Sequence, residues 1–173
     1  MENTEPAASP GSGASYQVPP QTRIGHVHLQ VTNIDKALGF YRDILGFRVM
    51  QRFGEQAAFI SAGGYHHHIG LNTWNSLDGP PARKHGAGLF HVAILYATRA
   101  ELAGALRQLA AAEYPITGSA DHGVSEAVYL DDPDGNGVEL YWDRPHAQWP
   151  LAPDGSVQMY TRALDLAGLL AER

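Results

Sequence analysis

Hydrophobic and polar positions alternate along two short segments of the chain, which begin about 65 residues apart. In residues 25–31 every second side chain is a branched apolar one, and residues 89–95 repeat this arrangement. A period of two is typical of a strand that buries one face. The pattern therefore predicts a β-strand in each segment, with His26 and His91 on the faces opposite the apolar rows.

A helical pattern follows each of these strands. The first helix is predicted from about Asn33 to Leu45, where apolar residues recur at helical spacing and Gly46 suits the end of a helix. The second opens on Thr98 and Glu101, which have the spacing of a capping box, and leucines then recur through about residue 112.

Three further short strands are predicted after each helix. They lie near residues 47–52, 57–62 and 66–74 in the first half of the chain, and near residues 115–119, 124–130 and 137–142 in the second. The order of elements thus repeats, which predicts an α+β fold of two tandem βαβββ modules, at about 24–75 and 88–143. We expect the modules to form one cupped, partly closed mixed β-sheet with the helices outside.

The modules together define a predicted domain at residues 23–143. Residues 1–22 are rich in Pro, Ser and Gly and are expected to form a flexible tail. Residues 144–173 form a C-terminal extension, which begins as a Pro-rich loop and ends in a short apolar helix at 164–172. We expect that helix to pack over a sheet edge or against a second subunit.

Composition narrows the classes of function. The chain has 173 residues, of which 44% are hydrophobic and 17% charged, as in a single domain with a core. A net charge of -6 without a basic run argues against a nucleic-acid partner. The absence of cysteine excludes disulfides and thiolate ligands. No apolar stretch is long enough to span a bilayer, and the first 22 residues lack the apolar core of a signal peptide, so we expect a cytoplasmic protein with no membrane partner.

Three side chains with metal-ligand chemistry fall on the predicted concave face. His26 and His91 occupy equivalent positions in the two modules, and Glu139 lies between Val138 and Leu140, where a carboxylate is costly unless paired or coordinated. A lone strand histidine is more often a hydrogen-bonded structural residue than a ligand, but the set of three favours a metal site. Two imidazoles and one carboxylate suit a divalent first-row metal, and they suit Fe(II) when substrate and O₂ must bind together.

The segment from His122 to Glu139 carries a more specific pattern. Together with the doubled βαβββ order over residues 24–143, it resembles the vicinal oxygen chelate superfamily, which includes glyoxalases, fosfomycin-resistance and bleomycin-resistance proteins, and extradiol ring-cleaving dioxygenases. Within that superfamily the segment is similar to the extradiol dioxygenase signature, from which Ala120 departs conservatively. The matching residues are His122, Val128, Tyr129, Asp132, Pro133, Gly135 and Glu139.

The resemblance implies roles for these residues. His26, His91 and Glu139 match the ligands of Fe(II). Mn(II) is the alternative metal for the same three ligands. Tyr129 matches a tyrosine that helps to bind and deprotonate a catechol, and His122 matches a histidine near the substrate.

The resemblance also implies a catalytic histidine on the fourth strand of the first module, where the chain reads His66-His67-His68. Strand alternation favours His68 as the residue that faces the cup, with His67 as the second choice. A run of three histidines is also compatible with a solvated strand end or an adventitious metal site.

The implied function is an Fe(II)-dependent extradiol dioxygenase that cleaves a catechol-type aromatic diol with O₂. The alternatives are a glyoxalase-like or fosfomycin-resistance-like enzyme with Ni, Zn, Mn or Mg, and a metal-free drug-binding resistance protein. Glyoxalases place a fourth ligand where this chain has Gly70, and metal-free binders usually lack the three ligands. Many extradiol enzymes carry two paired units and this chain has one, so a homo-oligomer partner or the C-terminal extension is expected to take the place of the other.

Overall fold

The structure is a computed structural model that describes residues 15–83 and 85–173. Most of the predicted N-terminal tail, residues 1–14, therefore lies outside the described residues. None of the helices in the described part is long and apolar enough to cross a membrane.

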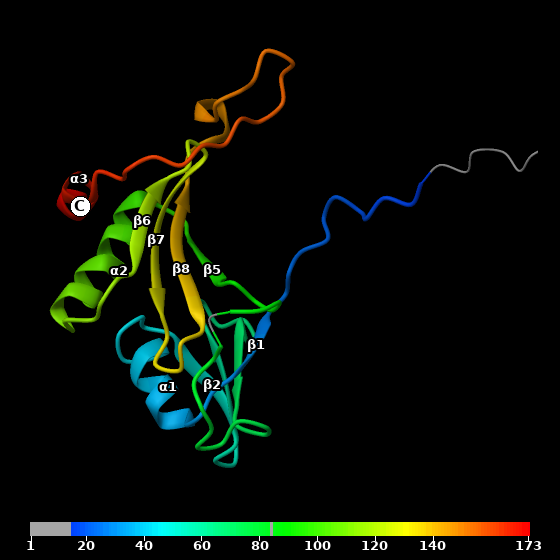
Figure 1. Cartoon of the computed structure of the whole chain (residues 1–173), viewed down its shortest axis with the longest axis vertical. Helices are drawn as coiled ribbons and strands as arrows, with labels where there is room; N and C mark the ends of the chain where they lie inside the picture. Colours follow the sequence, from blue (N-terminus) through cyan, green and yellow to red (C-terminus); the bar gives the residue numbers. More distant parts are fainter. Residues whose placement is uncertain (1–14, 84) are drawn as a thin grey trace, which may run out of the picture.

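The first module forms one four-stranded mixed sheet beside a single helix (Figure 1). Its elements are β1 (Val27–Gln30), α1 (Ile34–Tyr41), β2 (Arg48–Phe53), β3 (Ala57–Ser61) and β4 (Ile69–Asn72). The strand order is β1-β4-β3-β2, with β1 parallel to β4 and the other neighbours antiparallel.

The second module has the same architecture. Its elements are β5 (Val92–Tyr96), α2 (Arg99–Ala111), β6 (Gly118–Asp121), β7 (Ser125–Asp131) and β8 (Gly137–Asp143). The order β5-β8-β7-β6 reproduces that of the first sheet. The α+β class and the doubled βαβββ module are confirmed, and the hydrogen bonds divide the predicted cup into two four-stranded sheets with β1 and β5 at their edges.

The helix caps follow the local sequence. The Asn33 side chain accepts the backbone N–H of Lys36 and so caps α1. At α2 the capping box is complete: Thr98 accepts the N–H of Glu101, and the Glu101 carboxylate accepts the N–H of Thr98. Gly46 has a φ of 83°, a left-handed conformation that glycine adopts at low cost after α1.

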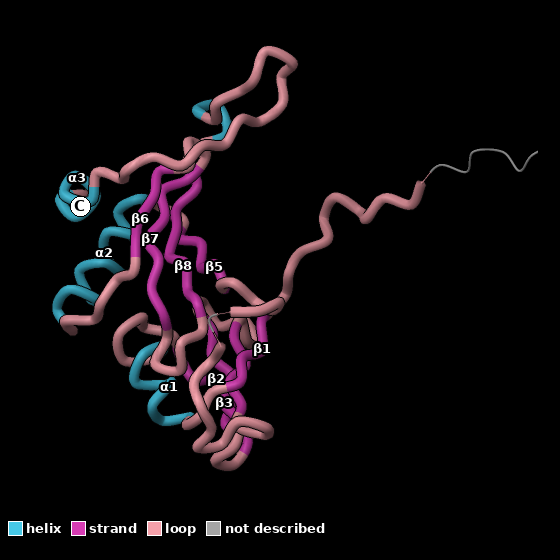
Figure 2. The backbone as a smooth tube through the Cα atoms, viewed as in Figure 1, coloured by secondary structure: helices cyan, strands magenta, loops and turns pink. Residues whose placement is uncertain are grey.

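Both helices lie on the same side of the sheets and share one hydrophobic core (Figure 2). Strand β8 shows how the core positions the other face. Val138 and Leu140 are fully buried and belong to the core. Glu139, which lies between them, and Tyr141, which follows them, are half-buried. Because side chains alternate along a strand, burial of the aliphatic row places Glu139 on the face away from the helices.

The turn between β7 and β8 joins the two modules. Asp132 is buried and accepts hydrogen bonds from the Tyr41 hydroxyl of α1 and from the backbone N–H groups of Asp134 and Asn136. Asp134 accepts the backbone N–H and the hydroxyl of Thr32, at 2.9 and 2.6 Å. Although burial opposes the effect, these bonds hold the pKa of Asp134 below its usual value. The turn between β7 and β8 is therefore also a polar contact between the modules.

The C-terminal extension returns to the second module. It contains a 3₁₀ turn at His146–Gln148 and ends in α3 (Leu166–Ala171), whose Leu169 is fully buried. The helix packs on α2. Arg99 of α2 fixes this position, because its guanidinium donates to Glu126 of β7 and to Glu172 beyond α3.

We predict that Asp132→Ala lowers the free energy of unfolding by about 3 kcal/mol. The change leaves the buried Tyr41 hydroxyl and two backbone N–H groups without their acceptor. Urea denaturation measures the loss. Asp43→Ala is the matched control, because Asp43 is exposed and pairs only with its neighbour Arg42. Equal stability of the two variants would contradict the role of Asp132 in joining the modules.

Candidate active site

The face of the second sheet opposite the helices carries three of the predicted site residues. Glu139 of β8 lies directly across from Tyr129 of β7 in the antiparallel register. His91 immediately precedes β5, which runs parallel to β8, and its Nε2 lies 2.9 Å from Oε2 of Glu139. The Glu139 side chain is 12% exposed, so this carboxylate is held close to an imidazole in a mostly buried place.

His91 is held in position by packing. Its ring lies 5.4 Å from that of Phe90 and 5.9 Å from that of Tyr129, measured between centroids. A side chain at Gly137 would collide with the backbone of residues 90 and 91, so glycine there allows the chain to approach β8 closely. Within the described residues, Nδ1 of His91 is buried without a hydrogen-bond partner. Buried polar atoms are seldom left unpaired, which favours a site that a bound group completes.

Tyr129 and His122 form a second contact on the same sheet. Nε2 of His122 lies 2.6 Å from the Tyr129 hydroxyl oxygen. Burial, together with the nearby charge of Glu139, raises the pKa of Tyr129 to about 12. The Tyr129 hydroxyl thus keeps its proton at neutral pH and is a hydrogen-bond donor there.

The histidines of the first module gather at the start of β1. His26 immediately precedes β1, as His91 precedes β5, which confirms that the two occupy equivalent places in the modules. The His26 ring lies 4.5 Å from that of His67, and Nδ1 of His67 is 2.7 Å from Nδ1 of His66. Burial and the neighbouring histidines, His26 first among them, lower the pKa of His67.

The His68 ring contacts the end of β3. Its Nδ1 is 3.0 Å from the Ser61 hydroxyl, and the backbone N–H of Ala62 donates to the same atom. The backbone of His68 donates to the Ile60 carbonyl and accepts the N–H of Val27, although β4 is assigned only from Ile69, so the strand pairing reaches His68 but not His67. In this structure His67 is the one whose ring lies beside His26.

His28 fills the space above Gly70, where the sequence left room for a fourth ligand. An added Cβ at Gly70 would lie 2.9 to 3.0 Å from the His28 ring. The ring also lies 5.4 Å from that of Trp74, and burial, followed by the charge of His26, lowers the pKa of His28. A histidine ring thus stands where a glyoxalase-type carboxylate was considered.

The predicted three-ligand group is only partly assembled. His91 and Glu139 lie together, whereas His26 stacks on His67. Among residues 15–83 and 85–173, no group of three or more His, Asp or Glu side chains is arranged to hold a metal ion. The donor chemistry of the pair suits a divalent cation, but two ligands do not make the three-ligand centre that the sequence predicts.

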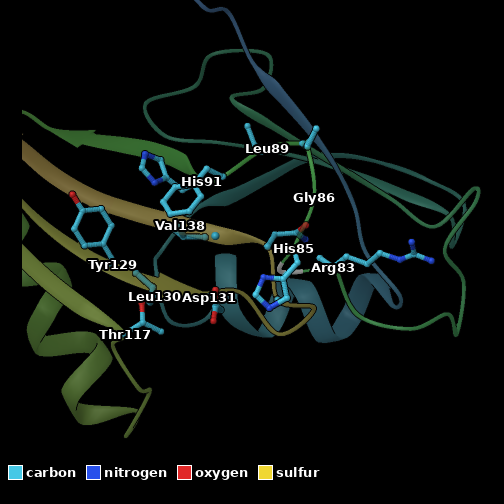
Figure 3. A pocket seen from close by; sticks show the side chains of 17 residues that line it. Arg83, His85, Gly86, Leu89, His91, Thr117, Tyr129, Leu130, Asp131 and Val138 are labelled. Carbon is cyan, nitrogen blue, oxygen red and sulfur yellow. The ribbon is translucent and has the colours of Figure 1, made fainter.

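A cavity of about 820 Å³ opens beside the pair, between the loop that precedes β5 and the β7–β8 hairpin (Figure 3). His91 and Tyr129 lie toward one end of it, and Arg83 and His85 toward the other. Its volume is in the range of pockets that hold small molecules. His26, His67, His68 and His122 do not line this cavity.

Sequence reasoning missed several polar residues of the cavity, among them Thr117, Asp131 and His85. The sequence pattern could have identified Asp131, because it follows Tyr129 by two residues on the same strand and so lies on the same face. Thr117 and the loop residue His85 carry no pattern that would have identified them, since they meet the cavity only through the fold.

The comparisons with known proteins agree with this architecture. The sequence model of the Glyoxalase/Bleomycin resistance protein/Dioxygenase superfamily matches residues 23–140. A catechol-2,3-dioxygenase of Bacillus subtilis (strain 168) is 41% identical over 152 residues, which are 87% of this chain and 52% of that protein. A biphenyl-2,3-diol 1,2-dioxygenase of Rhodococcus globerulus, numbered 3, is 29% identical over 70% of this chain and 63% of its own length. The chain thus spans between half and two thirds of these relatives.

Solved structures share the fold. Lactoylglutathione lyase from Agrobacterium tumefaciens is 24% identical, with a TM-score of 0.56 over 72% of this chain and 96% of that one. A glyoxalase/dioxygenase from Nostoc punctiforme is 21% identical, with a TM-score of 0.59 over 78% of this chain and 100% of its own. At these identities the likeness describes the fold alone.

We predict that Gly70→Ala displaces the His28 ring, because the new methyl group would lie within 3.0 Å of it. NMR spectra of the histidine ring protons, assigned with His28→Gln, should show a changed His28 resonance as the ring moves relative to Trp74. Gly39→Ala in α1 is the matched control, since an added Cβ there meets no atom within 4 Å. An unchanged His28 resonance in Gly70→Ala would show that the ring does not cover this position.

Proposed function

Because the chain belongs to the Glyoxalase/Bleomycin resistance protein/Dioxygenase superfamily, we propose that it is an extradiol dioxygenase that uses Fe(II) and O₂ to cleave a catechol-type aromatic diol. One observation carries the proposal. Tyr129 lies on the open face of the sheet between Glu139, its cross-strand neighbour, and His122, which is 2.6 Å from its hydroxyl. A metal site on this fold that does not cleave an aromatic diol would not need this tyrosine.

The curated relatives support the same reaction class. The names of two of them describe dioxygenases of an aromatic 1,2-diol, a catechol in one and a biphenyl-2,3-diol in the other. The first is 41% identical across most of this chain. Since the chain spans about half of that relative, its activity and substrate are proposals here.

His91 and Glu139 are the residues that would hold the metal, with His26 of the first module as the third ligand. Their chemistry fits Fe(II), and Mn(II) is bound by the same donors. When bound, the metal supplies a Lewis acid that makes the diol more acidic and open positions for substrate and O₂. In the described residues His91 and Glu139 already lie together, and His26 would join them as the third ligand.

The protein's own groups provide the binding and the proton transfer. The Tyr129 hydroxyl is protonated at neutral pH and Tyr129 lines the cavity, so its oxygen can accept a hydrogen bond from a diol hydroxyl while its own proton is donated to His122. His122 contacts the same hydroxyl through Nε2 and so is placed to take a proton that Tyr129 passes on. Leu89, Phe90 and Val138 add apolar surface to the cavity, which suits an aromatic ring.

A histidine near O₂ is the remaining part of the proposal. His67 and His68 were the candidates, and the ring contact between His67 and His26 supports His67. His68 bonds to Ser61 and Ala62, which ties it to the end of β3. A histidine beside the O₂ position would stabilise negative charge and supply a proton.

The glyoxalase-like alternative has less support at this site. Its fourth ligand would occupy position 70, where this chain has glycine and the His28 ring fills the space. The contact of Tyr129 with His122 would also have no part in that chemistry.

The proposed reaction is tested by anaerobic reconstitution with Fe(II), followed by a panel of catechols in air. We expect oxygen uptake and a yellow ring-fission product. His91→Ala and Glu139→Gln should give no product and lose stoichiometric iron, because each removes a ligand. Asp143→Asn is the matched control, since Asp143 is an exposed carboxylate four residues further along β8.

Two outcomes would count against the proposal in different ways. Full iron occupancy in Glu139→Gln would refute the ligand assignment. Absence of oxygen uptake by the iron-loaded protein across the whole panel would refute the reaction.

We further predict that Tyr129→Phe retains iron but lowers kcat by roughly 100-fold, the usual contribution of a positioned acid–base group. The phenylalanine keeps the ring on β7 and removes only the hydroxyl that contacts His122. Steady-state kinetics and iron analysis of the same sample separate the two effects. Unchanged turnover would exclude the hydroxyl from the reaction.

A further inference from the structure

The C-terminal extension passes the ends of β6, β7 and β8 on its way to α3 (Figure 1). Tyr160 in this segment contacts His122. We call residues 158–163 the strap. The backbone N–H of Arg162 donates to the Asp121 carbonyl at 2.9 Å, and the N–H of Asp121 donates to the Arg162 carbonyl at 3.0 Å. The N–H of Tyr160 donates to the His122 carbonyl at 3.2 Å. The strap is therefore hydrogen-bonded to the end of β6.

Glycine at position 123 lets the strap lie this close. Gly123 has a φ of 80°, and an added Cβ would lie 2.7 Å from the Tyr160 ring and 2.8 Å from Pro150. The Arg162 guanidinium covers the Tyr160 ring at 4.1 Å from its centroid. The extension and the turn after β6 thus pack as one unit around His122.

The His122 imidazole has an oxygen partner at each of its nitrogens. Nδ1 lies 3.0 Å from the Tyr160 carbonyl oxygen, and Nε2 lies 2.6 Å from the Tyr129 hydroxyl oxygen. The Thr161 hydroxyl lies 3.3 Å from Nδ1. The imidazole therefore bridges the strap and the tyrosine of the proposed site.

The carbonyl decides which nitrogen carries the proton. A carbonyl oxygen only accepts hydrogen bonds, so Nδ1 of His122 must be the donor in this contact. A neutral imidazole has one N–H, which leaves a lone pair on Nε2 facing the Tyr129 hydroxyl. The opposite tautomer would set the Nδ1 lone pair against the carbonyl oxygen at 3.0 Å.

We propose that the strap is a positioning element: the Tyr160 carbonyl holds His122 in its Nδ1–H tautomer, so that Nε2 accepts the hydrogen bond of Tyr129. The consequence for catalysis rests on the proposed function. When Tyr129 accepts a proton from the diol, its own O–H bond breaks and an N–H bond forms at Nε2. The resulting imidazolium keeps its Nδ1–H on the strap carbonyl, as the histidine of a catalytic triad is held by its carboxylate.

The tautomer is measured by long-range ¹H–¹⁵N NMR of the histidine rings in the metal-free full-length protein. The sample is held near pH 8, where imidazoles are mostly neutral. His122→Gln assigns the resonances by their loss. We expect a protonated, pyrrole-type Nδ1 and an unprotonated, pyridine-type Nε2 at His122.

Two variants at one position separate the strap backbone from its side chain. Arg162→Pro removes the N–H that donates to Asp121, so we expect averaged ¹⁵N shifts from two exchanging tautomers. Arg162→Ala keeps that N–H and removes only the guanidinium over Tyr160, so the Nδ1–H tautomer should persist. In the iron-loaded enzyme, Arg162→Pro should lower kcat about tenfold with KM and iron content unchanged.

Tyr129→Phe provides a second test that does not disturb the strap. The Nδ1–H tautomer should persist in this variant, because the strap and not the tyrosine sets it. An Nε2–H tautomer in the wild-type protein, loss of the Nδ1–H tautomer in Tyr129→Phe, or its retention in a folded Arg162→Pro variant would each overturn the proposal. If Arg162→Pro does not fold, the wild-type and Tyr129→Phe spectra still decide.

Failure of the strap proposal can be told apart from failure of the proposed function. The NMR readout needs neither metal nor substrate. A protein with the expected tautomer that cleaves no diol contradicts the function alone, and an active dioxygenase with the other tautomer contradicts the strap alone.

Discussion

Two buried carboxylates in one turn hold the modules of this protein together. Asp132 and Asp134 are 4% and 3% exposed, and a carboxylate so deeply buried is stable only when its oxygens are fully hydrogen-bonded. Their donors come from Tyr41, Thr32 and Lys36 of the first module, about 100 residues away in sequence. Slippage of the turn along α1 would remove these donors from both carboxylates, so these bonds restrict the relative placement of the two sheets.

That restriction bears on the proposed metal centre. Two of its ligands, His91 and Glu139, belong to the second module and meet through the parallel pairing of β5 with β8. His26 belongs to the first module and stacks on His67. Local strand geometry therefore positions the ligands within each module. How near the ligand of the first module lies to those of the second depends on the contact between modules at the β7–β8 turn.

The sequence predicted what is local and periodic. The alternation around Glu139, the capping box at Thr98 and the repeated order of strands were all readable, because each depends on residues a few positions apart. The sequence did not show where β4 begins, because the run of histidines before Ile69 has no alternation of apolar and polar residues. The preference for His68 rested on alternation counted back from Ile69, whereas the His68 ring contacts Ser61 and the His67 ring is the one beside His26.

Contacts between distant segments were beyond the reach of the sequence. The sequence places Asp132 and Asp134 between two predicted strands but does not show their bonds to Thr32 and Tyr41. In the same way His122 was recognised from the signature, while its contact with the strap at Tyr160 joins residues 38 positions apart in a Pro-rich extension without a pattern. The cavity residue Thr117 was missed for the same reason.

The guanidinium of Arg99 joins the first turn of α2 to Glu126 inside the sheet and to Glu172, the penultimate residue of the chain. Arg99 therefore forms ion pairs with a buried carboxylate and with one near the end of the chain. A protease that nicked the chain after Asp165 would release α3 and Glu172 together, and would bare the buried surface of α2 that Leu169 covers. The last few residues therefore pack as part of the fold. Their loss would expose α2, the helix that supports the sheet of the proposed site.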